Sequence, residues 1–404
     1  MLVWATAGCT SDPIQRTDSA DGPRSDLPQP TGHIVTRWRQ DPFAYGSYSY
    51  LAVGATPADR AVISTLIDRR LVLAGEATDQ AHPSTVHGAL QAGRDAAKAV
   101  SEAGATSVLV VGAGMAGVGA AQQLTEEGVQ VQLLEGRDRI GGRIHTDTSL
   151  GVPLDLGASW IHGERGNPLT EIADDADVDR IETDYDSIEV RSADGSLLDY
   201  DDVPYELVEL LEIVNEYAAD IDQLAPGFDD EGEDDRGADV LFPGGYRQLV
   251  DHLADGLDIT TSAVVDRVTL TDDGRARVAA GTDTWEADAV IVTVPLGVLQ
   301  HDVISFDPPL PAATRAAIDR LGMGHLSKVY LRFDEVFWDE DVEVIGHVSD
   351  PLGAFPVWFN MYPSTGEPIL LAFHGGRAAD ALTELSDEQI VAQATAALEG
   401  MYGG

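Results

Sequence analysis

The sequence has almost no cysteine, and this limits the sites it can contain. Cys9 is the only one among 404 residues, so an internal disulfide is impossible and a cysteine-based metal site has no basis. Cys9 precedes a Ser-, Asp- and Pro-rich stretch, which resembles the tether of a lipid-anchored protein without the usual signal peptide. Residues 1–30 are therefore predicted to be a disordered leader. The compartment stays open between the cytoplasm of a salt-adapted organism and a lipid anchor at Cys9.

Long hydrophobic runs and basic residues are also scarce. No apolar segment approaches the roughly 20 residues that span a bilayer, so no integral membrane segment is expected. The chain has 25 Lys and Arg against 69 Asp and Glu, a formal net charge of −44. Such a surface repels phosphates, which argues against nucleic acid as a partner. The acidic residues are spread along the chain, which favours a halophilic, salt-adapted surface over a specific attraction for cationic substrates.

The sequence does contain one strong local pattern, which is a glycine-rich turn between a strand and a helix. Residues 107–111 (SVLVV) form an apolar run typical of a buried parallel strand. Gly112, Gly114 and Gly117 follow, and the spacing predicts a helix and then a strand over 129–134. In dinucleotide-binding folds these glycines allow a tight turn, close approach of a pyrophosphate and close packing of the helix.

Charged residues after the second strand indicate the adenosine end of such a cofactor. Glu135 ends the strand, where a carboxylate accepts hydrogen bonds from ribose hydroxyls and repels a 2′-phosphate. Arg137 and Arg143 can hold a pyrophosphate as bidentate cations, and Gly142 lets the chain pass close to it. Ala116, in the first turn of the helix, is counted with the predicted cofactor-binding residues.

The stretch from Gly136 to Arg143 (GRDRIGGR) resembles the extended FAD fingerprint of the flavin-containing amine oxidase family, which includes polyamine oxidases, monoamine oxidases and lysine-specific histone demethylases. Further blocks resemble the same family: 155–163 (DLGASWIHG), 242–246 (FPGGY), 287–299 (ADAVIVTVPLGVL) and 324–338 (GHLSKVYLRFDEVFW). The resemblance implies an α/β fold with a Rossmann-type FAD-binding domain and a mixed-sheet α+β substrate domain.

Other blocks of the family stand at an unexpected place in the chain. They are 36–38 (TRW), 46–50 (GSYSY), 74–78 (AGEAT) and 85–89 (TVHGA). All precede the glycine turn, whereas in the family they lie near the C-terminus, and each occurs once. The order implies a circular permutation in which residues 101–106 join the family's usual termini. An artificial or mis-assembled gene is the alternative.

The resemblance also divides the chain into domains. The FAD-binding domain is expected to comprise 31–165 and 240–300, and the substrate-binding domain 166–239 and 301–404. The acidic run over 228–239 is interpreted as a solvated loop, and no metal site is expected in the chain.

Four residues match the family's catalytic region. By resemblance, Lys328 would hold a water beside the flavin and exchange protons during imine hydrolysis or oxygen reduction. His162 would bond a substrate nitrogen, with a structural histidine as the alternative. Tyr48 and Trp38 would wall the flavin and substrate with aromatic surface, or else belong to the core.

The remaining matches concern the flavin itself. Glu76 would accept hydrogen bonds from ribityl hydroxyls, and Ser47 stands where monoamine oxidases carry a cysteine bonded to flavin, so the FAD should be noncovalent. The other predicted cofactor contacts are Thr85, Val86, Ser159, Trp160 and Val265.

The resemblance implies an enzyme that oxidises a polyamine, or a related primary or secondary amine, to an imine and then an aldehyde, with O2 reduced to H2O2. One alternative is an L-amino-acid oxidase, in which Arg247, Arg332 or Arg377 would clamp the substrate carboxylate. A second is a flavin-binding protein without turnover. The sequence does not indicate an oligomeric state.

Overall fold

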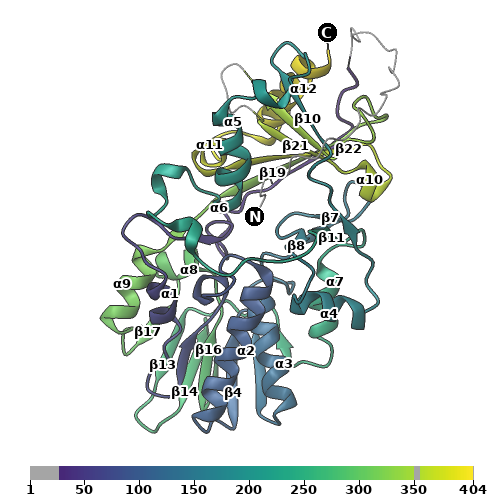
Figure 1. Ribbon diagram of the computed structural model, residues 1–404. Helices are drawn as coiled ribbons and strands as arrows, with labels where there is room; N and C mark the ends of the chain where they lie inside the picture. The colour runs from purple at the N-terminus through teal and green to yellow at the C-terminus, as the bar shows by residue number, and fades with distance from the viewer. Residues whose placement is uncertain (1–26, 350–354, 404) are drawn as a thin grey trace.

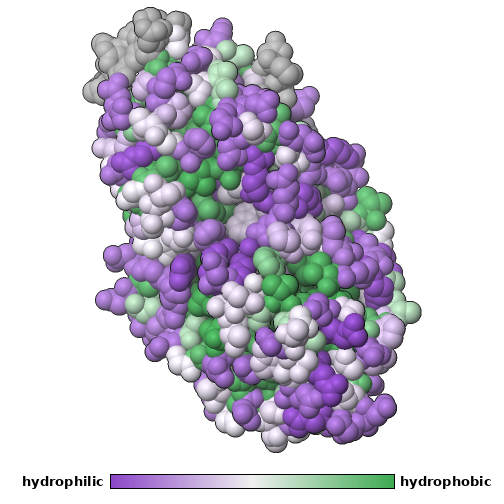
Figure 2. Space-filling model, turned by 180° about the vertical axis from the view of Figure 1, so that it is seen from behind, coloured by the Kyte–Doolittle hydropathy of each residue, from purple (hydrophilic) through white to green (hydrophobic). Residues whose placement is uncertain are grey.

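The computed structural model describes residues 27–349 and 355–403, so Cys9 and nearly all of the predicted leader lie outside the described residues. Figure 1 shows two layered regions, one around a parallel sheet and the other around a larger mixed sheet. In the described residues no helix is long and apolar enough to cross a membrane. Hydrophilic residues cover much of the face seen in Figure 2, as the net charge of −44 leads one to expect.

A five-stranded parallel sheet forms the centre of the first region. Its strands, in spatial order, are β12 (Ile259–Thr260), β5 (Gln130–Leu134), β4 (Ser107–Val111), β16 (Ala289–Val292) and β3 (Leu71–Leu73). Every neighbouring pair is parallel. The predicted strand over 107–111 is confirmed, because its side chains alternate between two separate hydrophobic clusters and both faces are therefore buried.

Helices cover one face of this sheet and a second sheet covers the other. Helices α2 (Val86–Glu102) and α3 (Met115–Glu126) pack closely, because a Cβ at Gly93 would lie 2.0 Å from the Ala116 carbonyl oxygen. The opposite face packs against β15 (Asp283–Ala287), β14 (Ala276–Ala280), β13 (Arg267–Leu270) and β17 (Ser305–Asp307), with α1 (Ala58–Ile63), α8 (Leu296–Gln300) and α9 (Ala312–Arg320).

The second region is built on a six-stranded mixed sheet. Its spatial order is β1 (Gly32–Val35), β19 (Leu326–Arg332), β22 (Ile369–Gly375), β21 (Val357–Asn360), β20 (Val344–Val348) and β10 (Ile188–Ser192). Helices α11 (Gly376–Leu382) and α12 (Asp387–Tyr402) lie along one face of this sheet. On its other face, a second group of helices lies near β20 and β22: α5 (Tyr205–Glu209), a π-helical turn (Leu210–Val214) and α6 (Asn215–Tyr217).

Short elements join the two regions around the site described below. They are β2 (Ser49–Tyr50) with β18 (Gly322–Met323), β6 (Thr146–Asp147) with β7 (Leu154–Asp155), the group β8 (Trp160–Ile161), β11 (Val240–Leu241) and β9 (Ile181–Glu182), and helices α4 (Pro168–Asp175), α7 (Arg247–Leu253) and α10 (Tyr362–Thr365).

Before β13 begins at Arg267, Ser262 takes a left-handed φ of 58° and residues 263–265 line a cavity. One detail differs from the sequence expectations. β1 falls within the segment assigned to the FAD-binding domain, yet it pairs with β19 in the six-stranded sheet. The domain boundaries themselves stay a prediction.

Candidate cofactor and amine site

A cavity of about 380 Å³ extends from the glycine turn of the parallel sheet to the inner face of the six-stranded sheet. All four predicted catalytic residues line it: Trp38, Tyr48, His162 and Lys328. Of the predicted cofactor-binding residues, those that line it are Gly112, Gly114, Ala116, Glu135, Arg137, Gly142, Arg143, Ser159, Trp160, Val265, Glu76, Thr85 and Val86. Segments from both ends of the chain thus meet at one site.

The glycine turn leaves open space where a phosphate group would sit. A Cβ at Gly114 would find only the Gly141 carbonyl oxygen, 3.9 Å away, so its position faces the cavity. Gly114 is also the N-cap of α3 and offers no capping side chain, which leaves backbone N–H groups of the first turn available to an anion. Gly117 does not line the cavity but packs, since a Cβ there would lie 1.8 Å from the Gly112 carbonyl oxygen.

Glu135 and Arg137 occupy the end of the cavity beyond β5. The Glu135 carboxylate accepts 2.8 Å hydrogen bonds from the backbone N–H groups of Ala113 and Arg137, and each oxygen keeps lone-pair capacity for a ribose hydroxyl. Arg137 differs from the expectation. Its two terminal nitrogens already bond the Asp41 carboxylate at 2.8 and 3.0 Å, so a bidentate hold on a pyrophosphate would first require this pair to break.

Glu76 and Arg143 form an ion pair in the middle of the cavity wall. One Glu76 oxygen accepts from Arg143 at 2.8 Å and the other from the Ser49 hydroxyl at 2.6 Å. Burial alone would raise the pKa of Glu76, but Arg143 and Ser49 outweigh it, and the net pKa is lowered. Thr85 caps the nearby start of α2 by accepting from Gly88 N–H at 3.0 Å.

Lys328 lies on β19 at the other end of the cavity, with 3% of its surface exposed. Its ammonium donates to the backbone oxygens of Asp155 and Gly157 at 3.0 and 2.7 Å and to the Ser159 hydroxyl at 2.5 Å. Burial lowers the pKa of Lys328, while the nearby Asp155 carboxylate opposes that shift. A buried amine with a lowered pKa can exchange protons near neutral pH. Lys328 is therefore a buried residue of β19 and not a surface lysine.

Aromatic side chains enclose this end of the cavity. Trp38 donates to the Leu156 carbonyl oxygen at 2.9 Å, and the Tyr48 hydroxyl donates to the Asn215 carbonyl oxygen at 2.5 Å. The Trp160 and Phe373 rings lie 5.5 and 5.4 Å from the Lys328 ammonium. These aromatic rings surround the buried amine of Lys328 with mostly apolar surface.

His162 lies at the cavity with 41% of its side chain exposed. Its Nδ1 is 2.8 Å from the Asp239 carboxylate, whose other oxygen accepts from Gly163 N–H at 2.9 Å. Burial would lower the pKa of His162, but Asp239 and then Glu216 outweigh that effect, and the net pKa is raised. The histidine is thus held by a carboxylate that the sequence did not single out.

Carboxylates of the acidic middle segment were missed as site residues. Glu212, Glu216 and Asp239 all line the cavity. Asp239 pairs with His162, but within residues 27–349 and 355–403 no lysine, arginine or histidine lies within ion-pair distance of Glu212 or Glu216. Their only sequence signal was their density, which does not distinguish a solvated carboxylate from one that faces a cavity.

The acidic run over 228–239 is only partly the solvated loop that was predicted. Glu231 makes an ion pair with the fully buried Arg60, Asp235 contacts two histidines, and Asp239 contacts His162. Glu231 and Asp239 are partly buried, whereas Asp235 contacts the histidines from an exposed position, and the other residues of 232–237 are exposed as well. The whole run was predicted to be solvated because the partners of these carboxylates are far away in the sequence.

None of the three arginines proposed as a carboxylate clamp lines the cavity. Arg247 pairs with Asp251 on the surface of α7, and Arg332 bonds Glu367 at the end of β19. Arg377 pairs with the exposed Asp222 and with the partly buried Asp220. Each guanidinium is therefore already committed elsewhere.

The cavity fits an extended dinucleotide that carries a flat ring system. The glycine turn offers space and N–H donors for a pyrophosphate, Glu135 offers acceptors for a ribose, and Glu76 offers a buried acceptor further along. The Ser47 hydroxyl exchanges hydrogen bonds with the Leu326 backbone and carries no sulfur for a covalent bond. The residues present therefore suit a noncovalent FAD with its ring near Lys328.

Comparison with known proteins gives the same assignment. The family model of the flavin containing amine oxidoreductases matches residues 17–101, 115–233 and 224–404. Polyamine oxidase 2 of Arabidopsis thaliana is 32% identical over 341 residues, which cover 70% of this chain and 69% of that protein. Lysine-specific histone demethylase 1 homolog 2 of the same plant is 30% identical over 356 residues, 74% of this chain and 48% of its own length.

Solved structures share the fold. Wild-type putrescine oxidase bound to putrescine superposes with a TM-score of 0.56 at 23% identity, covering 74% of this chain and 82% of that one. Cyclohexylamine oxidase from Brevibacterium oxydans gives a TM-score of 0.58 at 19% identity with the same two coverages.

Proposed function

The chain belongs to the flavin-containing amine oxidoreductase family and is an FAD-dependent amine oxidase, and we propose that its substrate is a polyamine or related amine with a second positive charge. The observation that carries this proposal is the pair of carboxylates, Glu212 and Glu216, that line the cavity without a cationic partner in the described part of the chain. A distal ammonium would supply the missing charge.

The cavity separates the charged and neutral ends of such a substrate. Lys328, Trp160 and Phe373 surround the inner end, where burial disfavours a cation and therefore favours the neutral amine that oxidation requires. Glu216 lines the cavity beside His162 and Tyr48, close enough that its charge raises the pKa of both. The substrate would place its reacting amine inward and its second ammonium outward.

The reaction requires proton transfers at two places, at the substrate ammonium and during hydrolysis of the imine. When bound, FAD accepts a hydride from the amine carbon and passes two electrons to O2, which leaves as H2O2. His162, paired with Asp239, can accept the proton that the entering ammonium releases. Lys328 can hold a water once one of its three present hydrogen bonds, such as that to the Ser159 hydroxyl, is released, and it can then deliver or accept the protons of imine hydrolysis, which yields aldehyde and free amine.

An amino acid fits this cavity less well. Its carboxylate would meet Glu212 and Glu216, and none of Arg247, Arg332 and Arg377 is near enough to neutralise it. Like charges brought together at a binding site oppose association. The structure therefore favours a diamine or polyamine over an L-amino acid.

Three related amines test the proposal under anaerobic conditions. Putrescine carries two ammonium groups, butylamine carries one, and ornithine carries two with an added carboxylate. We expect putrescine to bleach the flavin at concentrations about tenfold lower than butylamine, and ornithine to be the poorest. Glu216→Gln should remove the preference for putrescine without changing the response to butylamine.

Two outcomes would count against the proposal. Equal apparent affinity for putrescine and butylamine would remove the role of the second charge. Bleaching by ornithine or another amino acid alone would favour the L-amino-acid oxidase alternative, and no bleaching by any amine or amino acid would favour a flavin-binding protein without turnover.

A further inference from the structure

An acidic strap, residues 231–239, is fastened along the side of the cofactor region. At its start, the Glu231 carboxylate receives two hydrogen bonds, 2.8 and 2.9 Å long, from Arg60, which has no exposed surface. Two residues later, Glu233 N–H donates to the Ala81 carbonyl oxygen at 2.7 Å. At its end, Asp239 holds His162. The strap therefore connects the cofactor region to the mouth of the amine site.

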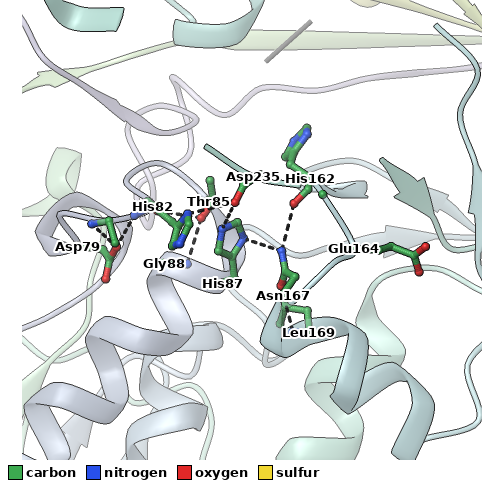
Figure 3. Close-up of polar contacts among 12 residues, drawn as sticks. Asp79, His82, Thr85, His87, Gly88, His162, Glu164, Asn167, Leu169 and Asp235 are labelled. Atoms are coloured by element: carbon green, nitrogen blue, oxygen red, sulfur yellow. Dashed lines mark hydrogen bonds and ion pairs between the residues drawn. The ribbon is translucent and has the colours of Figure 1, made fainter. Parts of the chain in front are cut away.

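Two histidines hold the middle of the strap through Asp235. One oxygen of the Asp235 carboxylate lies 3.0 Å from His82 Nδ1 and 3.2 Å from His87 Nε2 (Figure 3). His87 has 4% of its surface exposed, and in the described residues neither buried nitrogen makes a hydrogen bond of good geometry, so Asp235 approaches both rings as an ion-pair contact. Asp235 is thus the group that both rings face.

Asn167 fixes which nitrogen of His87 carries the proton. Its Oδ1 accepts from Leu169 N–H at 3.1 Å as the cap of α4, so its Nδ2 faces the other way. Nδ2 lies 3.1 Å from the His162 carbonyl oxygen and 3.2 Å from His87 Nδ1 (Figure 3). An amide nitrogen can only donate, so His87 Nδ1 accepts, and the neutral ring carries its hydrogen on Nε2, toward Asp235.

The same tautomer of His87 determines whether His82, His87 and Asp235 can bind a metal ion. The ligand atoms of His82, His87 and Asp235 lie within 4.8 Å of one another, a grouping that could hold a divalent metal. A metal would need the lone pair of His87 Nε2, but Asn167 directs the hydrogen to that nitrogen. Turning the amide over would place oxygen against the His162 oxygen and nitrogen against Leu169 N–H.

We propose that Asn167, His87 and Asp235 are positioning residues that latch the acidic strap to the start of α2 and so set the place of His162. The strap passes so close to the His162 loop that a Cβ at Gly163 would lie 2.4 Å from Arg236 N. Asn167 holds the His162 backbone, and Asp239 holds its ring. Release of the latch would loosen both supports. The effect on amine binding rests on the proposed function, whereas the latch itself does not.

Proteolysis of the holoenzyme measures the latch independently of turnover. Trypsin can cleave after Arg236, which is exposed and follows Asp235 directly. We expect Asp235→Ala to speed this cleavage about tenfold, because cleavage follows the population of the opened segment. Asp234→Ala is the matched control, since this exposed neighbour makes no ion pair among the described residues. Asp235→Asn keeps the shape of the side chain but removes its charge, so its cleavage rate should fall between those of the wild type and Asp235→Ala.

A second variant tests the network from the side of α4. Asn167→Ser keeps a good helix cap but cannot reach His87 or the His162 carbonyl oxygen. We expect it to raise KM for putrescine about fivefold with kcat nearly unchanged, and Asp235→Ala to do the same. A purely structural defect would instead lower FAD content and thermal stability together.

The outcomes separate the alternatives. Unchanged cleavage after Arg236 in Asp235→Ala would overturn the latch, as would a KM equal to that of the wild type in both variants. One tightly bound metal ion per chain in dialysed holoenzyme, removed by EDTA, would overturn the tautomer and replace the latch with a metal site. Absence of any amine oxidation by the wild type would refute the proposed function, while the cleavage experiment would still decide the latch.

Discussion

The cofactor end and the amine mouth of the cavity are built in different ways. At the cofactor end, backbone groups and glycines from one short stretch, residues 112–143, line the cavity together with segments such as residues 75–89. At the mouth, the Asp239 carboxylate contacts His162, and the charge of Glu216 acts on the same ring, although both are far from His162 in sequence. A backbone-built site leaves a spacing pattern in the sequence, and a side-chain-built site does not, because its geometry exists only after the chain has folded.

Lys328 stands where these two regions meet, and its removal should have the largest effect. We expect Lys328→Met to lower turnover at saturating amine about a hundredfold, since it removes the proton-exchanging group. FAD content should remain at the wild-type level, because the ammonium bonds only Asp155, Gly157 and Ser159. Stopped-flow absorbance of the flavin would measure both. A loss of FAD with no loss of rate per bound flavin would assign Lys328 to the cofactor end instead.

Glu76 tests the cofactor end alone. Glu76→Gln should weaken FAD binding about tenfold, because it leaves Arg143 partly buried without its charge partner and alters the acceptor on the cavity wall. The relative preference for putrescine over butylamine should not change. Titration of the apoprotein with FAD, followed by substrate assays on the reconstituted enzyme, would show whether the two regions are separable.

Substrate binding at the mouth should depend on salt concentration. Screening weakens the attraction between a diamine and exposed carboxylates, so KM for putrescine should rise about threefold between 0.15 and 1 M KCl, while KM for butylamine stays nearly constant. Over the same range the melting temperature should rise, because screening also relieves the self-repulsion of a chain with a net charge of −44. A melting temperature that falls with salt would contradict the proposed halophilic surface.

The His162–Asp239 pair should add a pH dependence to the mouth. Because the folded-state pKa of His162 is raised, the pair stabilises the fold fully below the unfolded histidine pKa of about 6.5 and loses that contribution as pH rises through the folded pKa. Asp239→Asn should lower the pKa of His162 and flatten this part of the stability profile. An NMR titration, with His162→Gln to assign the resonance, would measure the shift directly.

The order of the family blocks should matter least. We propose that the chain is a circular permutation, and a reordered gene tests it: residues 107–404, a short Gly-Ser linker, then residues 27–106. We expect the same flavin spectrum and KM as the original order. A reordered protein that cannot bind FAD would show that the two joined segments do not lie close together.

The sequence predicted the cofactor end well and the mouth poorly. β4 and the turn at Gly112 were placed correctly, because apolar runs and glycine spacing are local consequences of burial and backbone geometry. Lys328 was identified through resemblance, and its burial on β19 is confirmed. Lys328's partner groups, Asp155 and Ser159, come from another part of the chain and could not be inferred from spacing.

The misread residues share a physical reason. Arg137 was assigned to a phosphate, but it bonds Asp41, which lies 96 positions away. Asp235 and Glu231 were predicted to be solvated because nearby carboxylates are, yet Glu231 is buried against Arg60 and Asp235 contacts His87. Charge density along a sequence carries no information about which side chains find distant partners.

Helix α2 ends at Glu102 and β4 begins at Ser107, so only a short turn separates them. As a result β3, a 3-10 helix (Glu76–Thr78), α2, β4, α3 and β5 follow one another in the sequence over residues 71–134. This run holds Glu76, Thr85 and Gly114, which line the cavity from different sides. Contacts close in sequence form fastest, so the cofactor site should assemble early in folding and during synthesis, before the six-stranded sheet can close over it.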